Sequence, residues 1–181
     1  MHMNSFKFFC YIDRFDNSLI NKLSKTTSVI YRNYNKHSDI TTIIKIKNAC
    51  KKRGIKFYLS NNIKLAMKLN LNGAYIPGFN KSLNFNSYNL KKNFELLGSA
   101  HNLKEIRLKE LQNINIIFLS SLFTSKKNKR CLGIYKFLNL MKKTKKKIIC
   151  LGGITQQNLK IIKTLNCHGV AAISLFSNEV F

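Results

Sequence analysis

The chain has 181 residues, 45% of them apolar, and its 32 lysine and arginine residues against seven acidic ones give a formal net charge of +25. The apolar content suffices for a packed core and argues against a disordered chain, and no apolar run approaches the ~20 residues that a membrane span needs. The chain opens with no signal-peptide pattern and its five cysteines form no CxxC pair, which together favour reduced thiols and a cytoplasmic protein.

The first half of the chain alternates short apolar runs with helical patterns. Strands are expected at residues 6–14, 28–34, 56–60 and 73–76, and helices at residues 17–24, 38–53 and 63–70. Ser38 is a suitable N-cap for the second helix, and Gly54 a suitable residue to end it. Residues 83–93 are polar and poorly periodic, so the connection after the fourth strand is expected to be reduced.

The second half continues the alternation. Strands are expected at residues 96–100, 114–122, 148–151 and 170–175, and helices at residues 103–111, 132–143 and 156–165. Strands that alternate with single helices imply right-handed crossovers and a parallel sheet. The strand runs are continuously apolar, as expected when helices cover one face and a core the other.

Eight such strands predict an α/β fold of the (β/α)8 TIM-barrel type, with a doubly wound open sheet as the alternative. The length lies below the roughly 200 residues usual for this barrel, so a minimal barrel is expected. We expect no helix after the eighth strand, because the chain stops at Phe181. Residues 1–181 contain no linker rich in proline, glycine or serine and are expected to form a single domain.

A phosphate site is expected where the seventh and eighth strands end. Gly152 and Gly153 follow the seventh strand and precede a helix, and glycines let backbone N–H groups approach an anion closely. In barrels of this type the loops after strands seven and eight commonly hold phosphate. We therefore expect the backbone N–H groups of Gly152, Gly153, Ile173 and Ser174 to bind a phosphate group.

The densest basic stretches are two runs, at residues 126–130 and 142–147. One interpretation is nucleic-acid binding. The other is a compositional bias, since lysine, asparagine and isoleucine are abundant together while proline and tryptophan are scarce. No aromatic stacking pattern accompanies the basic runs, so we favour the compositional bias, with some attraction of an anionic substrate.

Segments along nearly the whole chain resemble one enzyme family. They include Val-Ile-Tyr-Arg-Asn-Tyr at residues 29–34, Gly-Ser-Ala-His-Asn at residues 98–102 and Leu-Gly-Gly-Ile at residues 151–154. Further segments lie at residues 58–66, 72–77, 118–125 and 169–174. In this order and spacing they resemble the thiamine phosphate synthase/TenI superfamily.

The resemblance implies a transferase that joins a hydroxymethylpyrimidine diphosphate to a thiazole phosphate. Diphosphate leaves, and the thiazole nitrogen attacks the resulting pyrimidine-stabilised carbocation. The family holds Mg²⁺ with carboxylates after strands three and four, where this chain has Asn61 and Asn80. We therefore expect no metal site in the protein alone, and Mg²⁺ only together with a diphosphate ligand.

The resemblance also assigns roles to individual positions. The expected catalytic residues are Arg32, Ser99, Ser125 and Lys126, and the expected substrate-binding residues are Tyr31, Asn61, Asn62 and Lys127. Two of these positions have a purely structural alternative. Ser99 could cap the following helix, and Arg32 could form an ion pair with Asp13.

Three hypotheses for the function follow. The first is a thiamine phosphate synthase in which Arg32, Lys126 and Lys127 replace much of the metal's charge. The second is a phosphate-binding barrel that is catalytically degenerate or has another specificity, and the third is a basic nucleic-acid-binding protein. The first two need only small phosphorylated substrates as partners and no membrane. The sequence does not decide whether the protein catalyses a reaction, which substrate it binds or whether it forms a homo-oligomer.

Overall fold

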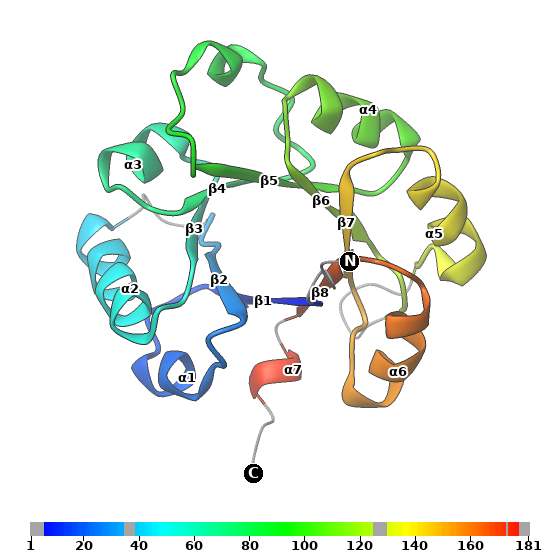
Figure 1. Cartoon of the computed structure of the whole chain (residues 1–181), viewed down its shortest axis with the longest axis horizontal. Coiled ribbons are helices and arrows are strands. Elements are labelled where there is room, and N and C mark those ends of the chain that lie inside the picture. The colour runs from blue at the N-terminus through cyan, green and yellow to red at the C-terminus, as the bar shows by residue number, and fades with distance from the viewer. Residues whose placement is uncertain (1–5, 35–38, 125–129, 173, 178–181) are drawn as a thin grey trace.

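The strands close into a barrel in a computed structural model that describes residues 6–34, 39–124, 130–172 and 174–177 (Figure 1). Each strand pairs in parallel with the next one along the chain, and the last pairs with the first. The strands are β1 (Lys7–Ile12), β2 (Thr27–Tyr31), β3 (Phe57–Ser60), β4 (Gly73–Ile76), β5 (Glu95–Ala100), β6 (Ile116–Ser120), β7 (Lys147–Leu151) and β8 (Gly169–Ala172). The predicted barrel is confirmed, and the open sheet was the wrong alternative.

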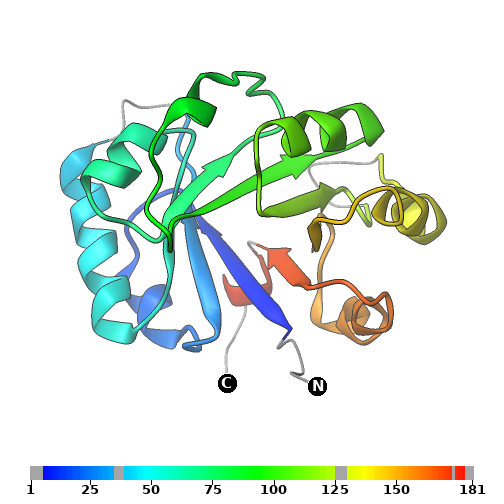
Figure 2. The same cartoon turned by 45° about the horizontal axis from the view of Figure 1, so that its top comes forward.

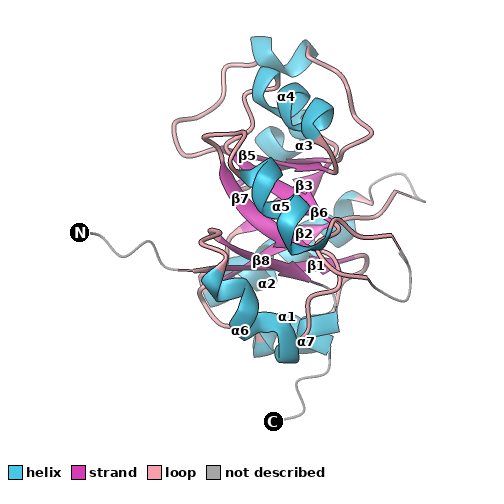
Figure 3. Cartoon of the chain, turned by 90° about the vertical axis from the view of Figure 1, so that its right-hand side faces the viewer, coloured by secondary structure: helices cyan, strands magenta, loops and turns pink. Residues whose placement is uncertain are grey.

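The helices lie outside the strands, as Figure 3 shows. They are α1 (Asn17–Lys22), α2 (Ile40–Arg53), α3 (Ile63–Lys68), α4 (Leu103–Leu111), α5 (Gly133–Met141), α6 (Gln156–Thr164) and α7 (Ser174–Ser177). Gly54 ends α2 in the left-handed conformation, as predicted, with φ 68°. Asp39 caps α2, whereas Ser38 lies outside the described residues. Among the described residues, no helix combines the length and the apolar content that crossing a bilayer requires.

Two connections depart from the regular alternation. After β4 the chain forms only the 3₁₀ turn η1 (Asn84–Ser87), which agrees with the reduced connection expected there. After β8 a single helical turn follows, so the expectation of no helix was wrong, and so was the strand extended to Leu175. The turn buries Leu175 and Phe176, which an extended chain leaving the rim would expose.

Aromatic side chains fill the inside of the barrel. The ring centroids of Phe9 and Phe118 lie 4.9 Å apart, those of Tyr75 and Phe118 5.4 Å, and those of Tyr11 and Tyr75 5.6 Å, all edge to face. A second apolar cluster lies between the strands and the helices. The barrel is therefore a packed core, and ligands can reach it only at a rim.

Because all strands are parallel, the residues that follow them meet at one rim. The tilted view of Figure 2 shows the strands arranged around a ring, with helices outside it. Backbone hydrogen bonds continue past the strand ends: Arg32 N donates to Ile12 O at 2.8 Å, and Asn61 N to Tyr75 O at 2.8 Å. The carboxyl-terminal rim is thus a rigid frame for the side chains it presents.

Candidate functional site

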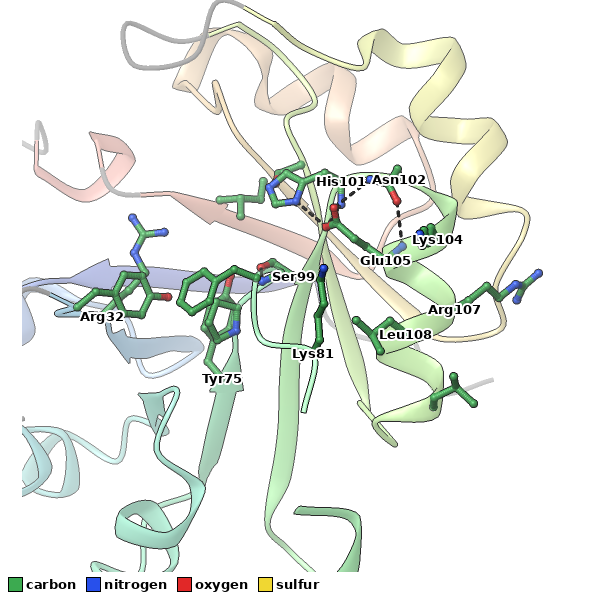
Figure 4. Close-up of a pocket in the computed structure, with 17 residues that line it drawn as sticks. Arg32, Tyr75, Lys81, Ser99, His101, Asn102, Lys104, Glu105, Arg107 and Leu108 are labelled. Atoms are coloured by element: carbon green, nitrogen blue, oxygen red, sulfur yellow. Dashed lines mark hydrogen bonds and ion pairs between the residues drawn. The ribbon is translucent and has the colours of Figure 1, made fainter. Parts of the chain in front are cut away.

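A cavity of about 1040 Å³ opens at the carboxyl-terminal rim. Its inner part is lined by side chains at the strand ends, namely Arg32, Tyr75, Ser99, Ser120 and Leu151. Its outer part lies between the loop after β4 and helix α4, and is lined among others by Phe79, Lys81, Lys104, Arg107 and Leu111. In Figure 4, Arg32 lies at one end and Arg107 at the other, with Tyr75, Ser99 and Lys81 between them.

Arg32 presents its charge to the inner cavity. Its guanidinium carbon lies 4.9 Å from the ring centroid of Tyr11 and 6.0 Å from that of Tyr34. These aromatic faces orient the guanidinium without neutralising it. The alternative ion pair with Asp13 is not formed among the described residues. Arg32 is therefore placed to meet an anion in the cavity.

Ser99 is buried at the end of β5 and faces the same cavity. Its Oγ accepts a hydrogen bond from the backbone N–H of Gly78 at 2.9 Å. The alternative in which Ser99 caps α4 was wrong, because Asn102 is the cap and accepts from Glu105 N at 2.9 Å. Beside Ser99, burial raises the pKa of the Tyr75 hydroxyl, which stays neutral at physiological pH.

A carboxylate lies at the start of α4, in the wall of the cavity. Glu105 Oε2 lies 2.8 Å from Nδ1 of His101, and Glu105 Oε1 accepts from the side-chain amide of Asn102 at 2.9 Å. The backbone N–H of His101 also donates to this carboxylate, at 3.0 Å. Glu105 thus holds the β5–α4 turn together, and its oxygens are already hydrogen-bonded.

The two loop positions expected to replace metal-binding carboxylates contact each other. Asn80 Nδ2 donates to Asn61 Oδ1 at 2.7 Å, and Asn80 Oδ1 accepts from Ser82 N at 2.9 Å. Asn62 caps α3 and accepts from Leu65 N at 3.0 Å. All three amide oxygens therefore already accept hydrogen bonds.

The described residues consequently do not fit the Mg²⁺ site that the resemblance implies. Among them, no three histidine, cysteine, aspartate or glutamate side chains are placed to hold a metal ion together. Asp16 and Asp39 cap helices, while Glu95 pairs with Lys56 at 3.2 Å and Glu110 with Arg107 at 2.7 Å.

The glycine turn after β7 has a structural role of its own. Gly152 has φ 95° and Gly153 φ 66°, and the loop after β6 packs directly on both. A Cβ on Gly152 would lie 2.1 Å from Ser121 Oγ, and one on Gly153 2.4 Å from Thr124 O. Among the described residues neither glycine N–H donates a hydrogen bond.

The other expected site residues are placed as follows. Tyr31 packs in the cluster between strands and helices and does not line the cavity, because the adjacent Arg32 takes the inward direction. Asn61 and Asn62 line a smaller cavity of about 260 Å³ beside α3. Ser174 begins α7. The remaining four, Ser125, Lys126, Lys127 and Ile173, lie outside the described residues.

Sequence reasoning missed most of the outer cavity. Tyr34 and Phe79 come from different loops, and their ring centroids lie 5.4 Å apart. Phe79 is 64% exposed, and an aromatic residue in a polar loop was the signal that could have marked it. Lys81 and Lys104 carried no distinguishing signal, since exposed lysines occur throughout this chain.

Comparisons with known protein sequences agree with one another. The family model described as thiamine monophosphate synthase matches residues 17–176. A thiamine-phosphate synthase of Flavobacterium psychrophilum is 28% identical over 160 residues, covering 79% of this chain and 74% of that protein. Thiamine-phosphate synthase 1 of Streptococcus pneumoniae is 24% identical over 139 residues, covering 74% of this chain and 66% of that protein.

Solved structures show the same fold. A thiamine phosphate pyrophosphorylase from Pyrococcus furiosus superposes with a TM-score of 0.80 at 16% identity, covering 97% of this chain and 90% of that one. FabK from Thermotoga maritima reaches a TM-score of 0.73 at 11% identity, covering 97% of this chain and 60% of that one. The barrel alone therefore does not distinguish one function from another.

Proposed function

The chain belongs to the thiamine monophosphate synthase family, and from this premise we propose that it joins a hydroxymethylpyrimidine diphosphate to a thiazole phosphate. The observation that carries the proposal is that Arg32 and Ser99 line one cavity, which reaches Leu151 immediately before the glycine turn. A cation and a hydroxyl thus adjoin backbone N–H donors, which suits two phosphorylated substrates held side by side.

Each part of the rim has a role in this proposal. Arg32, Lys81 and Lys104 attract the diphosphate, and Ser99 donates a hydrogen bond to it. The N–H groups of Gly152 and Gly153, with those of Ile173 and Ser174, hold the phosphate of the second substrate. Ser125, Lys126 and Lys127 complete the diphosphate side from the loop after β6. Holding both substrates in line lowers the barrier by orientation.

The proposal assigns no metal to the protein alone. Because the amide oxygens of Asn61 and Asn80 are hydrogen-bonded, a divalent cation enters only as the counter-ion of a diphosphate ligand. Titration calorimetry of the ligand-free protein with MgCl₂ should therefore give no binding below millimolar concentrations. Sub-millimolar binding without ligand would contradict this assignment.

The test of function is complementation of a thiamine-requiring bacterial strain that lacks its own synthase. The wild-type chain should restore growth without thiamine, and Arg32→Ala should abolish it. Lys45→Ala, which removes an exposed charge from α2, should grow like the wild type. If a folded wild-type chain fails to restore growth, the transferase proposal is wrong.

One observation favours a second candidate, a phosphate-binding barrel without transferase activity. Asn61 and Asn80 hydrogen-bond to each other where the resemblance implies metal-binding carboxylates. This candidate keeps the glycine turn but not the diphosphate half of the site. The second candidate predicts that thiazole phosphate binds and that the pyrimidine diphosphate does not. Calorimetry with each ligand decides between the two candidates.

A further inference from the structure

Helix α4 carries a lysine in the interior of the protein. Lys109 has 0% of its surface exposed. Burial of an ammonium is unfavourable unless its N–H groups are satisfied. Its Nζ donates to Pro77 O at 3.0 Å, to Asn80 O at 3.1 Å and to Gln112 Oε1 at 2.7 Å. Three acceptors thus match the three N–H groups of the ammonium.

Gln112 completes this arrangement from the end of α4. It is also fully buried, and its Nε2 donates to Asn80 O at 3.0 Å and to Ser82 O at 2.8 Å. The loop of residues 77–82 is therefore fixed to α4 through its backbone carbonyls. The same loop is tied to β5 by Ser99 and to the β3 loop by Asn61.

These bonds join two walls of the cavity. The loop of residues 77–82 supplies Gly78, Phe79 and Lys81 to one wall, and α4 supplies Lys104 and Leu108 to the other. In Figure 4 Lys81 extends from this loop towards the end of β5, which carries Ser99. The distance between the two walls consequently depends on the hydrogen bonds that Lys109 and Gln112 donate to the backbone of the loop.

We propose that Lys109 is the positioning residue of the cavity, whose buried ammonium, with Gln112, holds the loop after β4 in its ligand-binding conformation without a metal ion. Without the ammonium, Pro77 O and Asn80 O each lose one of two donors and keep only Asn80 N and Gln112 Nε2, so fewer hydrogen bonds hold the loop to α4. Its effect on ligand affinity rests on the proposed function, whereas its hold on the loop does not.

The test compares Lys109→Met with two control variants. Ile106→Val removes a buried methyl group from the same helix but no hydrogen bond, and Lys45→Met removes an exposed charge from α2. Amide hydrogen exchange reports on the loop, and calorimetry with inorganic diphosphate reports on the cavity. In Lys109→Met, exchange at Gly78, Asn80 and Ser82 should quicken at least about tenfold relative to the barrel strands, with a similar loss of diphosphate affinity. The control variants should keep the wild-type exchange rates in the loop and the wild-type affinity for diphosphate.

Gln112→Met is the second variant, for use if Lys109→Met fails to fold. It removes two donors to the loop and one of the three acceptors of the ammonium but keeps the bonds of Lys109 to the loop, so the same amides should exchange faster, by a smaller factor. Exchange that quickens equally in loop and strands, or loop exchange that stays unchanged, would overturn the proposal. Wild-type protein that binds no diphosphate would contradict the proposed function, and exchange alone would then decide the role of Lys109.

Discussion

At the scale of single residues, the burial of Lys109 makes its charge sensitive to pH. Loss of hydration lowers the pKa of this lysine to about 8, and the carboxylate of Glu105 opposes the change. In the unfolded chain the same lysine titrates near its ordinary value of 10.5. Between these two values the unfolded chain holds a proton that the folded protein has released.

Lys109 should therefore make the protein more stable as the pH rises from about 8 to about 10.5. The gain in the free energy of unfolding is at most about 3 kcal/mol, and the three hydrogen bonds to the ammonium reduce it. Urea unfolding of the wild type and of Lys109→Met across this range measures the difference. A constant difference between the two curves would show that Lys109 does not titrate there.

Gly153 is a second residue for which the surrounding structure predicts the effect of a substitution on stability. Its φ is 66°, and the loop after β6 leaves no room for a side chain. Gly153→Ala should thus destabilise the fold by about 2 to 4 kcal/mol, from strain and overlap together. Gly133→Ala is the matched control, since Gly133 has φ 70° with nothing within 4 Å of an added Cβ.

Gly133→Ala should cost only the backbone strain, about 1 kcal/mol. Denaturant unfolding of both variants gives the comparison, and equal losses would show that the loop after β6 yields to the added methyl group. Because Gly153→Ala perturbs the fold, loss of phosphate binding in this variant is no proof of contact. The N–H groups of the turn are better tested by changes in amide chemical shift on addition of thiazole phosphate.

At the scale of elements, the sequence predicted what periodicity and chain-breaking residues control. The bounds of β4 and α4 were predicted as the structure has them, because Pro77 ends the strand and the polar turn before Leu103 begins the helix. The apolar run at residues 170–175 predicts a strand up to Leu175, whereas β8 ends at Ala172 and α7 begins at Ser174. Its apolar residues are equally suited to a turn that packs on the barrel, and only closure of the barrel decides between them.

The candidate site was predicted less completely, for a physical reason. Strand ends locate Arg32 and Ser99 at the rim, since parallel strands end together. Lys109 lies three residues after the buried Ile106, on the inward face of α4, and a lysine at that spacing was a signal in the sequence. Its partners lie in the loop after β4, and no local pattern indicates such a contact.

The contact between β1 and β8 depends on Gly169. A Cβ at this position would lie 2.0 Å from the carbonyl oxygen of Lys7, its partner in the sheet. Gly169→Ala should destabilise the protein by at least about 2 kcal/mol, because both strands must move apart. Thermal and urea unfolding measure the loss. Gly54→Ala, with open space around the added methyl group, is the control, and a loss at Gly169 no larger than at Gly54 would contradict the argument.

At the scale of the whole molecule, the net charge of +25 has a testable consequence. If it reflects composition, duplex DNA should bind only through its phosphates, and affinity should fall by roughly a thousandfold between 50 and 200 mM salt. Fluorescence anisotropy with a labelled duplex measures this dependence. Tight binding that persists at the higher salt concentration would favour the nucleic-acid hypothesis instead.

The pairing of β1 with β8 also dictates when the barrel can form during protein synthesis. Every other pairing joins strands that the ribosome delivers one after the other, whereas β1 waits for its second neighbour until β8 has emerged. Until then one edge of β1 has unpaired backbone N–H and C=O groups, which can form hydrogen bonds to other chains and lead to aggregation. Closure joins the most distant strands of the chain, so we expect it to be slower than the pairing of consecutive strands.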